Sequence, residues 1–301
     1  MRIAGNRIGG LFGNKPMLVK FSVKACGVSH IEKGLPCQDA CCAQLGSSNR
    51  VGISCAADGH GSGKHFRSDK GSVLAVQTAE RALFDFCGTT ASAKAAFYNR
   101  EENNDKKNAA INSKLKELEG NIIYKWRKSV EEDLKQNPLT EAEIEICKNE
   151  NIPHEDPLIY GTTLLAGLVS ESFWFVIKIG DGGCVIIDET GEAQTLTELE
   201  DERLAFGRTS SLCDNNAIGN FREAYGLTRI KGLTVATDGM TDSFEPEKYL
   251  QFTKELYDKF TNMPAEIVEK ELFGFLPELS ERGSRDDISI AGIFRIERSK
   301  N

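Results

Sequence analysis

Three strand-like segments in the middle of the chain follow one another too closely to belong to a parallel sheet. Residues 162–169, 172–179 and 183–188 are rich in β-branched and aromatic residues, and only short turns separate them. Parallel neighbours need a crossover of about a dozen residues or more, whereas antiparallel neighbours need only a turn. We therefore expect an α+β fold of layered antiparallel sheets and helices, and not a doubly wound parallel sheet.

Hydrophobic periodicity predicts the other regular elements. Further strands are expected at 17–25, 51–57, 232–237 and 288–296. Helices are expected at 70–86, 246–262 and 264–280. The first of these helices would bury one face, made of Val73, Val76, Ala79 and Leu83. We find no internal repeat and expect one domain over residues 1–301.

A charged segment at about 99–156 interrupts this pattern. It predicts a long amphipathic helix that ends before Pro138, with an apolar stripe of Ile111, Leu115, Leu118, Ile122, Trp126, Val130 and Leu134. A short helix at about 140–149 would follow. An apolar stripe usually faces a core, so we expect a helical insertion packed outside the core, with a partner-binding arm as the alternative.

The segment at about 190–226 is polar and irregular, and glycine and asparagine punctuate it. Long irregular segments in compact domains tend to be functional or disordered. We expect a flap here.

Net charge and apolar content limit the kinds of partner and the location that we expect for this chain. The chain has 37 basic and 45 acidic residues, a net charge of −8, which argues against nucleic-acid or anionic-membrane binding. No apolar run approaches the roughly 20 residues of a membrane span, and the first residues do not resemble a signal peptide. We expect a cytoplasmic protein.

The nine cysteines do not form a regular framework. Cys37 and Cys41 have the spacing of one zinc-ligand pair, but no second pair accompanies them. Reduced thiols in a cytosolic protein are the preferred interpretation.

Aspartates next to glycine recur where predicted strands end. Asp58 and Asp238 each follow a strand, Asp181 lies between two glycines, and Asp286 precedes the last strand. If these strands share sheets, the acids meet on one rim, where they repel unless cations compensate. Oxygen ligands suit Mg²⁺ or Mn²⁺. Taken singly, each aspartate is better explained as a turn residue, and only their combination in order favours a metal site.

Taken together and in order, these motifs resemble those of the metal-dependent type 2C serine/threonine protein phosphatases, in their bacterial form. The matching motifs are Gln38-Asp39-Ala40, Ala57-Asp58-Gly59-His60-Gly61, Gly161-Thr162-Thr163, Gly180-Asp181-Gly182, Ala236-Thr237-Asp238-Gly239-Met240-Thr241-Asp242 and Gly283-Ser284-Arg285-Asp286-Asp287-Ile288-Ser289. The order agrees from about 17 to 296, although no motif places 99–156. The resemblance implies a four-layer α-β-β-α sandwich with two mostly antiparallel sheets.

The resemblance also implies a site for two Mn²⁺ or Mg²⁺ ions and a third, looser one. Asp58 would bridge the two ions, and their other ligands would be the Gly59 carbonyl, Asp238, Asp286 and, through water, Asp39. Asp181 and Asp242 would serve the third ion. A metal-bridging water would attack phosphorus, with His60 as the general acid; the alternative is that His60 only orients a water.

Three positions depart from the family pattern. Gln38 stands where many relatives have an acid, and Asp287 replaces the more usual asparagine, adding charge beside Asp286. Gly34 falls near the position of a phosphate-binding arginine. Lys33 or His30 would then take the phosphate, or both are ordinary surface residues.

The implied function is hydrolysis of phosphoserine and phosphothreonine in proteins. The partner would be a phosphorylated protein, a cognate serine/threonine kinase or its target, and the enzyme a monomer. A pseudophosphatase that binds phosphoproteins and an enzyme for small phosphoesters are the alternatives. A nucleotide-binding phosphate loop at 59–64 is disfavoured, because Asp58 and His65 occupy positions that need glycine and Ser or Thr.

Overall fold

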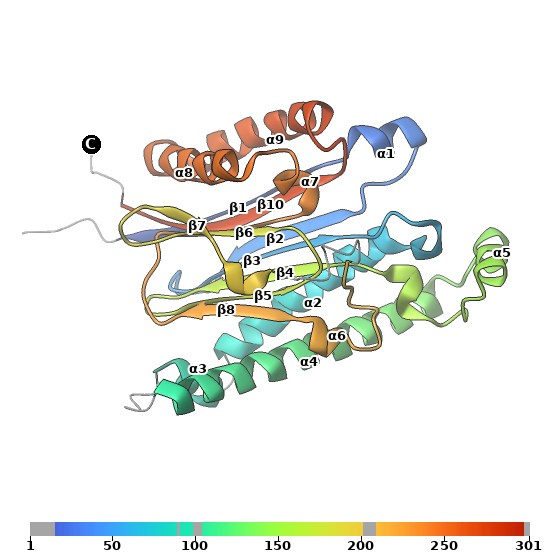
Figure 1. Cartoon of the computed structure of the whole chain (residues 1–301), viewed down its shortest axis with the longest axis horizontal. Helices are drawn as coiled ribbons and strands as arrows, with labels where there is room; N and C mark the ends of the chain where they lie inside the picture. The colour runs from blue at the N-terminus through green and yellow to red at the C-terminus, as the bar shows by residue number, and fades with distance from the viewer. Residues whose placement is uncertain (1–15, 89–90, 99–103, 201–208, 298–301) are drawn as a thin grey trace, which may run out of the picture.

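Two stacked antiparallel sheets with helices on both outer sides make up the fold (Figure 1). The computed structural model describes residues 16–88, 91–98, 104–200 and 209–297. All strand pairs within these ranges are antiparallel. The predicted four-layer α+β sandwich is confirmed.

Each sheet has five strands. Sheet A has the order β1 (Met17–Ala25), β10 (Ile288–Ile296), β9 (Gly232–Ala236), β6 (Gly183–Ile187) and β7 (Ala193–Thr195). Sheet B has the order β2 (Asp39–Leu45), β3 (Gly52–Asp58), β4 (Leu164–Val169), β5 (Trp174–Ile179) and β8 (Arg222–Gly226). The short turn between β5 and β6 therefore carries the chain from one sheet to the other.

Aliphatic side chains fill the space between the sheets. Leu165 and Val176 from sheet B meet a buried cluster that includes Val235 and Ile293 from sheet A. Helices cover the opposite faces, so β4, β5 and β9 are buried along their whole length. Burial on both faces explains why these strands have continuous apolar sequences instead of alternating ones.

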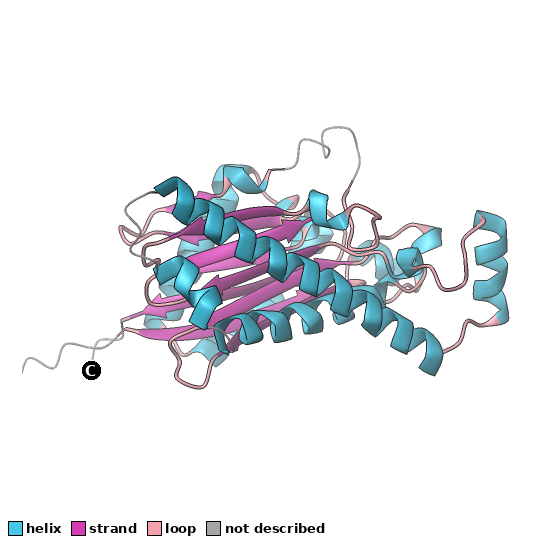
Figure 2. Cartoon of the chain, turned by 90° about the horizontal axis from the view of Figure 1, so that it is seen from below, coloured by secondary structure: helices cyan, strands magenta, loops and turns pink. Residues whose placement is uncertain are grey.

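Helices α2 (Ser68–Gly88), α3 (Ala91–Tyr98) and α4 (Asn104–Gln136) cover sheet B. Figure 2 shows helices lying across the strands on this side. The predicted stripe of α4 is confirmed: its residues are buried, except for the partly buried Leu134. On α2 the prediction for Val73 was wrong, because this residue is 38% exposed at the flank of a face formed by Ala75, Val76, Ala79 and Leu83.

Most of the charged insertion is thus a helix packed on α2. The Trp126 indole donates a hydrogen bond to the Gly71 carbonyl at 3.1 Å, which ties α4 to the start of α2. Helix α5 (Glu141–Glu150) then begins at a capping box formed by Thr140 and Glu143. Figure 1 shows α5 beyond the edge of the sheets.

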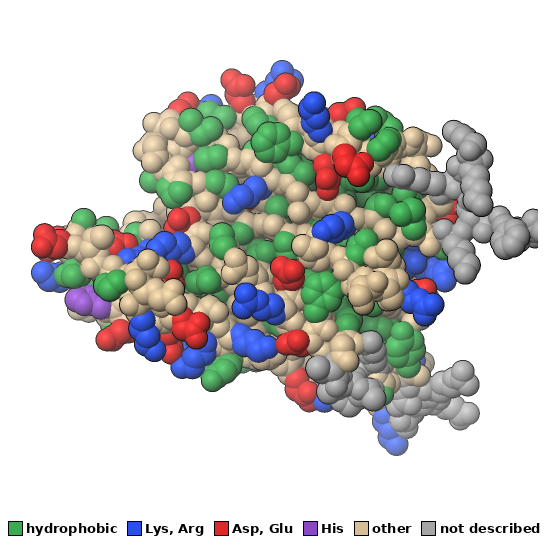
Figure 3. Space-filling view, turned by 180° about the vertical axis from the view of Figure 1, so that it is seen from behind, with side chains coloured by type: hydrophobic (Ala, Val, Ile, Leu, Met, Phe, Trp, Pro, Cys, Tyr) green, Lys and Arg blue, Asp and Glu red, His purple; other side chains and the backbone are tan. Residues whose placement is uncertain are grey.

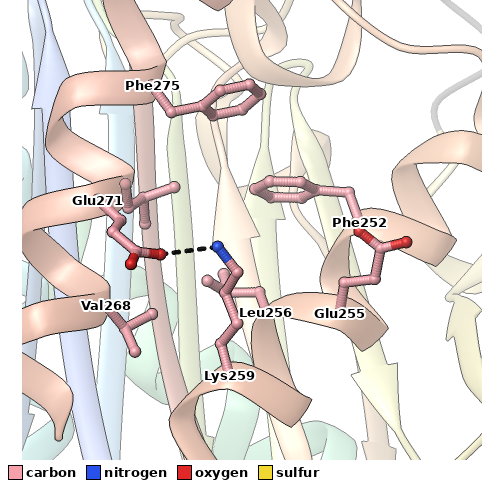
Figure 4. A pocket seen from close by; sticks show the side chains of 8 residues that line it. Phe252, Glu255, Leu256, Lys259, Val268, Glu271 and Phe275 are labelled. Carbon is pink, nitrogen blue, oxygen red and sulfur yellow. Dashed lines mark hydrogen bonds and ion pairs between the residues drawn. The ribbon is translucent and has the colours of Figure 1, made fainter. Parts of the chain in front are cut away.

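Helices α8 (Pro246–Asn262) and α9 (Ala265–Arg282) cover sheet A. An apolar groove of about 260 Å³ runs between them (Figure 4). Phe252 and Phe275 stack beside it with ring centroids 5.8 Å apart, and Lys259 pairs with Glu271 across it at 2.8 Å. These contacts join the two helices into one cover for sheet A.

Further parts of the structure differ from what the sequence predicted. The segment 190–226 contains regular elements: β7, a 3₁₀ turn at Thr197–Leu199, α6 (Ala217–Asn220) and β8, while 201–208 lie outside the described residues. Strand β2 was not expected, because its sequence Asp-Ala-Cys-Cys-Ala-Gln-Leu lacks the β-branched and aromatic residues that usually mark strands.

The surface has a mixed character. Acidic and basic side chains are interspersed on the face shown in Figure 3. No helix in the described ranges combines the length and apolar character that a membrane crossing requires.

The first testable prediction concerns Glu119, whose side chain is fully buried on α4 and pairs with Lys116 at 2.9 Å. Burial raises the pKa of the Glu119 carboxyl to about 7. A folded-state pKa above the unfolded one makes stability greatest below about pH 4.5 and lowers it as the pH rises through 7. Glu119→Gln should remove this decline and stabilise the protein at pH 8 by an amount on the order of 2 kcal/mol.

Urea denaturation between pH 4 and 8 measures this effect. Glu117→Gln on the same helix is the control, because the Glu117 side chain is 62% exposed and should leave the pH profile unchanged. Identical profiles for Glu119→Gln and wild type would contradict the prediction.

Candidate metal centre

Acidic residues from several strand ends meet at one end of the sandwich. Asp39 begins β2 and lies directly opposite Asp58, the last residue of β3. Asp238 begins α7 (Asp238–Thr241) just after β9, and Asp286 lies just before β10. The β5–β6 turn contributes Asp181. The strand pairing therefore gathers residues that are far apart in the sequence.

The turn that carries Asp181 requires its two glycines. Gly180 and Gly182 have φ angles of +99° and +76°, which side chains rarely adopt. A Cβ on Gly180 would also lie 2.4 Å from the Thr163 side chain. Thr163 in turn accepts a hydrogen bond from the Asp58 amide at 2.9 Å, so the turn packs directly against the end of β3.

The carboxylates of Asp58, Asp181 and Asp238 form the centre of this site, with one oxygen of each within 4.8 Å of the others. Burial, and then the charge of Asp39, raise the pKa of Asp58 well above its usual range. Burial and the charges of Asp181 and Asp286 raise the pKa of Asp238 to about 7. Acids crowded in this way need a compensating cation, and their hard oxygen ligands fit Mg²⁺ or Mn²⁺.

Asp39 lies buried behind this trio, only 1% exposed. Its Oδ2 accepts a hydrogen bond from the Thr237 hydroxyl at 2.6 Å. Its Oδ1 has no hydrogen-bond partner among the described residues. A buried oxygen without a partner is costly, and a water bound to a cation would satisfy it.

Asp286 and Asp242 lie at the edge of the cluster. The Asp286 side chain is 53% exposed. The pKa of Asp238 is raised mainly by burial, then by the charge of Asp181, and then by the charge of Asp286. Asp242 follows Asp238 by one helical turn, and burial, then Asp181 and Asp286, raise the pKa of Asp242. The structure thus groups Asp181 with Asp58 and Asp238, with Asp286 and Asp242 around them.

Asp287 has a structural function that the sequence did not reveal. We expected it to add charge beside Asp286, but it is 2% exposed and accepts hydrogen bonds from the backbone N–H groups of Gly27 at 2.6 Å and Gln38 at 2.5 Å. His30 Nδ1 lies 2.8 Å from its Oδ2. Asp287 therefore holds the start of α1 (Val28–Lys33) and the start of β2 against the cluster.

The two basic candidates for phosphate binding are placed differently. His30 is buried, and its Nε2 lies 3.6 Å from Asp286 Oδ1. Lys33 is exposed at the end of α1. Gln38, which stands in place of an acid, donates a hydrogen bond from its amide to the Ser68 hydroxyl at 2.8 Å.

His60 lies directly beyond the metal-ligand candidates Asp58 and Gly59. Its backbone N–H donates to the Gly161 carbonyl at 3.0 Å, and its ring centroid is 4.9 Å from that of His65. Burial and the proximity of His65 lower the pKa of His60 to about 4, so its ring is neutral at pH 7. Gly59 is required here because a Cβ would lie 2.5 Å from the Ser68 carbonyl oxygen.

A buried arginine connects this loop to the helical insertion. Arg67 binds both carboxylate oxygens of Glu143, at 2.7 and 2.9 Å, and donates to the Asn137 carbonyl at 2.7 Å. It also donates to the Tyr160 hydroxyl at 3.0 Å, and Tyr160 donates to Asp133. Arg67 therefore fastens the end of α4 and the start of α5 to the loop that carries His60.

Sequence reasoning did not identify Thr237, His65 and Arg67 as residues near the site, and it missed the structural function of Asp287. Thr237 and Asp287 lie inside quoted motifs, but nothing in a motif tells a ligand from the residue that supports it. Arg67 lies outside every motif, and its partners come from a segment that no motif placed. These residues become recognisable only once their partners are in position.

Comparisons with known proteins agree with this geometry. The family model of protein phosphatase 2C matches residues 26–277. A solved structure of the catalytic domain of the serine/threonine phosphatase PstP with two manganese ions has a TM-score of 0.51 and 15% identity, covering 94% of this chain and 100% of its own. The serine/threonine phosphatase of S. agalactiae has a TM-score of 0.53 and 16% identity, covering 92% and 99%. A search of the curated proteins gives no match.

A family match over most of the chain decides the class. The chain belongs to the protein phosphatase 2C family, and it is classed with the metal-dependent serine/threonine protein phosphatases. The solved structures show that the fold is shared with bacterial members.

The second prediction tests the repulsion in the cluster. Without divalent ions, Asp238→Asn should raise the unfolding temperature by a few degrees, because about 1 kcal/mol of relieved repulsion shifts the midpoint of a domain this large by roughly 2 °C. With Mn²⁺ the variant should gain less than wild type, because a candidate ligand is lost. Thermal unfolding in EDTA and in Mn²⁺ measures both effects. Asp258→Asn on the exposed side of α8 is the control and should unfold at the same temperature as wild type. A lower unfolding temperature for Asp238→Asn than for wild type in EDTA would contradict the prediction.

The third prediction concerns Arg67. Arg67→Ala should lower the free energy of unfolding by about 3–5 kcal/mol, because the buried partners of the arginine are left unpaired. Urea denaturation measures the loss. Lys128→Ala is the control, since its pair with Glu131 is about half exposed on both sides and should contribute little. Equal stability of the two variants would contradict the prediction.

Proposed function

We propose that this chain hydrolyses phosphoserine and phosphothreonine in proteins with Mn²⁺ or Mg²⁺ as cofactor. The observation that carries the proposal is the carboxylate cluster of Asp58, Asp181 and Asp238 at one rim of the sandwich. Acids with raised pKa values in a shared site typically mark function rather than structure. The manganese-bound PstP structure, with two ions on the same fold, supports the choice of cofactor.

Two ions and a third, looser one would divide the acids among them. Asp58, the Gly59 carbonyl, Asp238 and Asp286 would hold the first two, with Asp39 acting through water. Asp181 and Asp242 would hold the third. When bound, such ions supply Lewis acidity and lower the pKa of water at the site.

We further propose that His60 gives a proton to the leaving serine or threonine oxygen. Its place after Asp58 and Gly59 supports this function. Because the resting ring is neutral, the approach of a doubly charged phosphate group would have to raise the pKa of His60 before transfer. His30, buried beside Asp286, would contact the phosphate oxygens, a more direct position than that of exposed Lys33.

The partner would be a phosphorylated protein, a serine/threonine kinase or its target. We expect a monomer that acts in the cytoplasm. A phosphoprotein-binding pseudophosphatase is the alternative, and the retained acids argue for catalysis instead.

The fourth prediction is a loss of activity in Asp58→Asn. Wild-type protein should hydrolyse p-nitrophenyl phosphate only with Mn²⁺ or Mg²⁺, and Asp58→Asn should lose this activity by about a hundredfold or more, because the central ligand is removed. Steady-state kinetics at several metal concentrations measure the loss. An inactive wild-type protein with either metal would favour the pseudophosphatase, and faster hydrolysis of sugar phosphates than of phosphoserine peptides would favour a small-molecule substrate.

The fifth prediction separates proton donation from metal binding. His60→Gln should slow hydrolysis of a phosphoserine peptide by about 10²–10⁴-fold, because alkoxide is a poor leaving group that needs a proton. Hydrolysis of p-nitrophenyl phosphate should fall much less, since its phenolate leaves without help. Comparing kcat on the two substrates measures the difference. Equal losses on both would assign His60 to the orientation of water.

A further inference from the structure

A pocket of about 440 Å³ opens beside the acidic cluster, and we call it the side pocket. Asp242 lines it, as does Gly182, the residue that follows Asp181 in the β5–β6 turn. Its volume lies within the roughly 300–1,000 Å³ of pockets that take small ligands. A phosphate group held at the cluster would bring neighbouring parts of the same molecule to its mouth.

Most of its wall is apolar. The apolar lining comes from β6, from the segment after β7 and from the start of α8, and comprises Cys184, Leu196, Leu199, Phe244, Pro246 and Tyr249. The rings of Phe244 and Tyr249 lie with centroids 6.0 Å apart and tilted by 36°. Aromatic faces in this arrangement suit a further apolar or aromatic group.

Lys178 and Thr241 in the side pocket are already engaged and Asp242 belongs to the cluster, whereas the Tyr249 hydroxyl is buried without a hydrogen-bond partner among the described residues. Lys178 is the one cation among its described lining residues, and its Nζ donates to the Gly182 carbonyl at 2.8 Å. The Thr241 hydroxyl donates to the Asp238 carbonyl at 3.2 Å. Asp242 and Glu200 would repel an acidic group. The lining therefore favours an apolar side chain over an anionic one.

We propose that the side pocket binds a large apolar side chain of the phosphoprotein substrate, near the phosphorylated residue in its sequence. This inference rests on the proposed function and makes the pocket a determinant of substrate choice. Burying one large apolar side chain removes apolar surface from water, which favours binding. A preference of about tenfold for such a residue over alanine is therefore the expected size of the effect.

Strand β7 offers a matched pair of variants. Thr195 lines the side pocket and pairs with Val185, which packs against α8. Gln194, its neighbour, pairs with Ile186, which packs between the sheets instead. Successive strand residues point to opposite faces. A tryptophan in Thr195→Trp would therefore enter the pocket from its own lining, whereas Gln194→Trp adds the same bulk at a neighbouring residue that is not part of the lining.

The experiment measures kcat/KM for phosphoserine peptides that carry Phe, Leu, Ala or Lys at each position from three before to three after the phosphoserine. The preference is the ratio of Phe or Leu to Ala at one position within each protein, so changes in basal activity cancel. Wild type and Gln194→Trp should show the tenfold preference, and Thr195→Trp should bring the ratio close to one. Phe244→Ala, which removes part of the wall, should also lower it.

The outcomes separate this inference from the proposed function. Hydrolysis of p-nitrophenyl phosphate by wild type, which needs no peptide side chain, tests the metal site alone. An active enzyme without apolar preference at any position would overturn the pocket and leave the phosphatase standing. A preference that persists in both Thr195→Trp and Phe244→Ala would also overturn it. No activity on any phosphoester would reject the proposed function itself.

Discussion

Mutual repulsion among buried carboxylates is the constraint on which the rest of this structure depends. Asp39, Asp58 and Asp238 are drawn out of water beside one another, and burial raises the pKa of each of them. The fold holds these groups together although they destabilise it in the absence of cations. A divalent cation converts the repulsion into binding energy, because it needs the concentrated negative charge that the apo site resists.

Hydrogen bonds from neighbouring residues keep the site in place. The Thr237 hydroxyl supports Asp39, and Asp287 anchors backbone N–H groups on two segments that border the cluster. Arg67 connects the His60 loop to the end of α4, so the charged insertion helps to hold that loop. The insertion is thus part of the structural support of the loop that carries His60.

Much of the fold followed from local pattern. The short turn between β4 and β5 led to antiparallel pairing, and the apolar stripe of α4 identified a packed helix. The expectation was wrong for the equally short β5–β6 turn, which joins strands of different sheets. Errors arose where local signals are weak. Strand β2 has few strand-forming residues, β7 and β8 are short edge strands within a polar segment, and Val73 lies at the flank of a helical face that only the packing of α2 defines.

The sequence by itself determined which residues could bind cations, since acids beside glycines at strand ends can be recognised without a fold. Only the tertiary structure decided which of them share a centre. It brought Asp181 to Asp58 and Asp238, because the β5–β6 turn crosses from one sheet to the other at the rim. It also placed the Asp287 side chain where it binds backbone N–H groups. Distances between residues remote in sequence depend on sheet pairing and packing, and no local pattern records them.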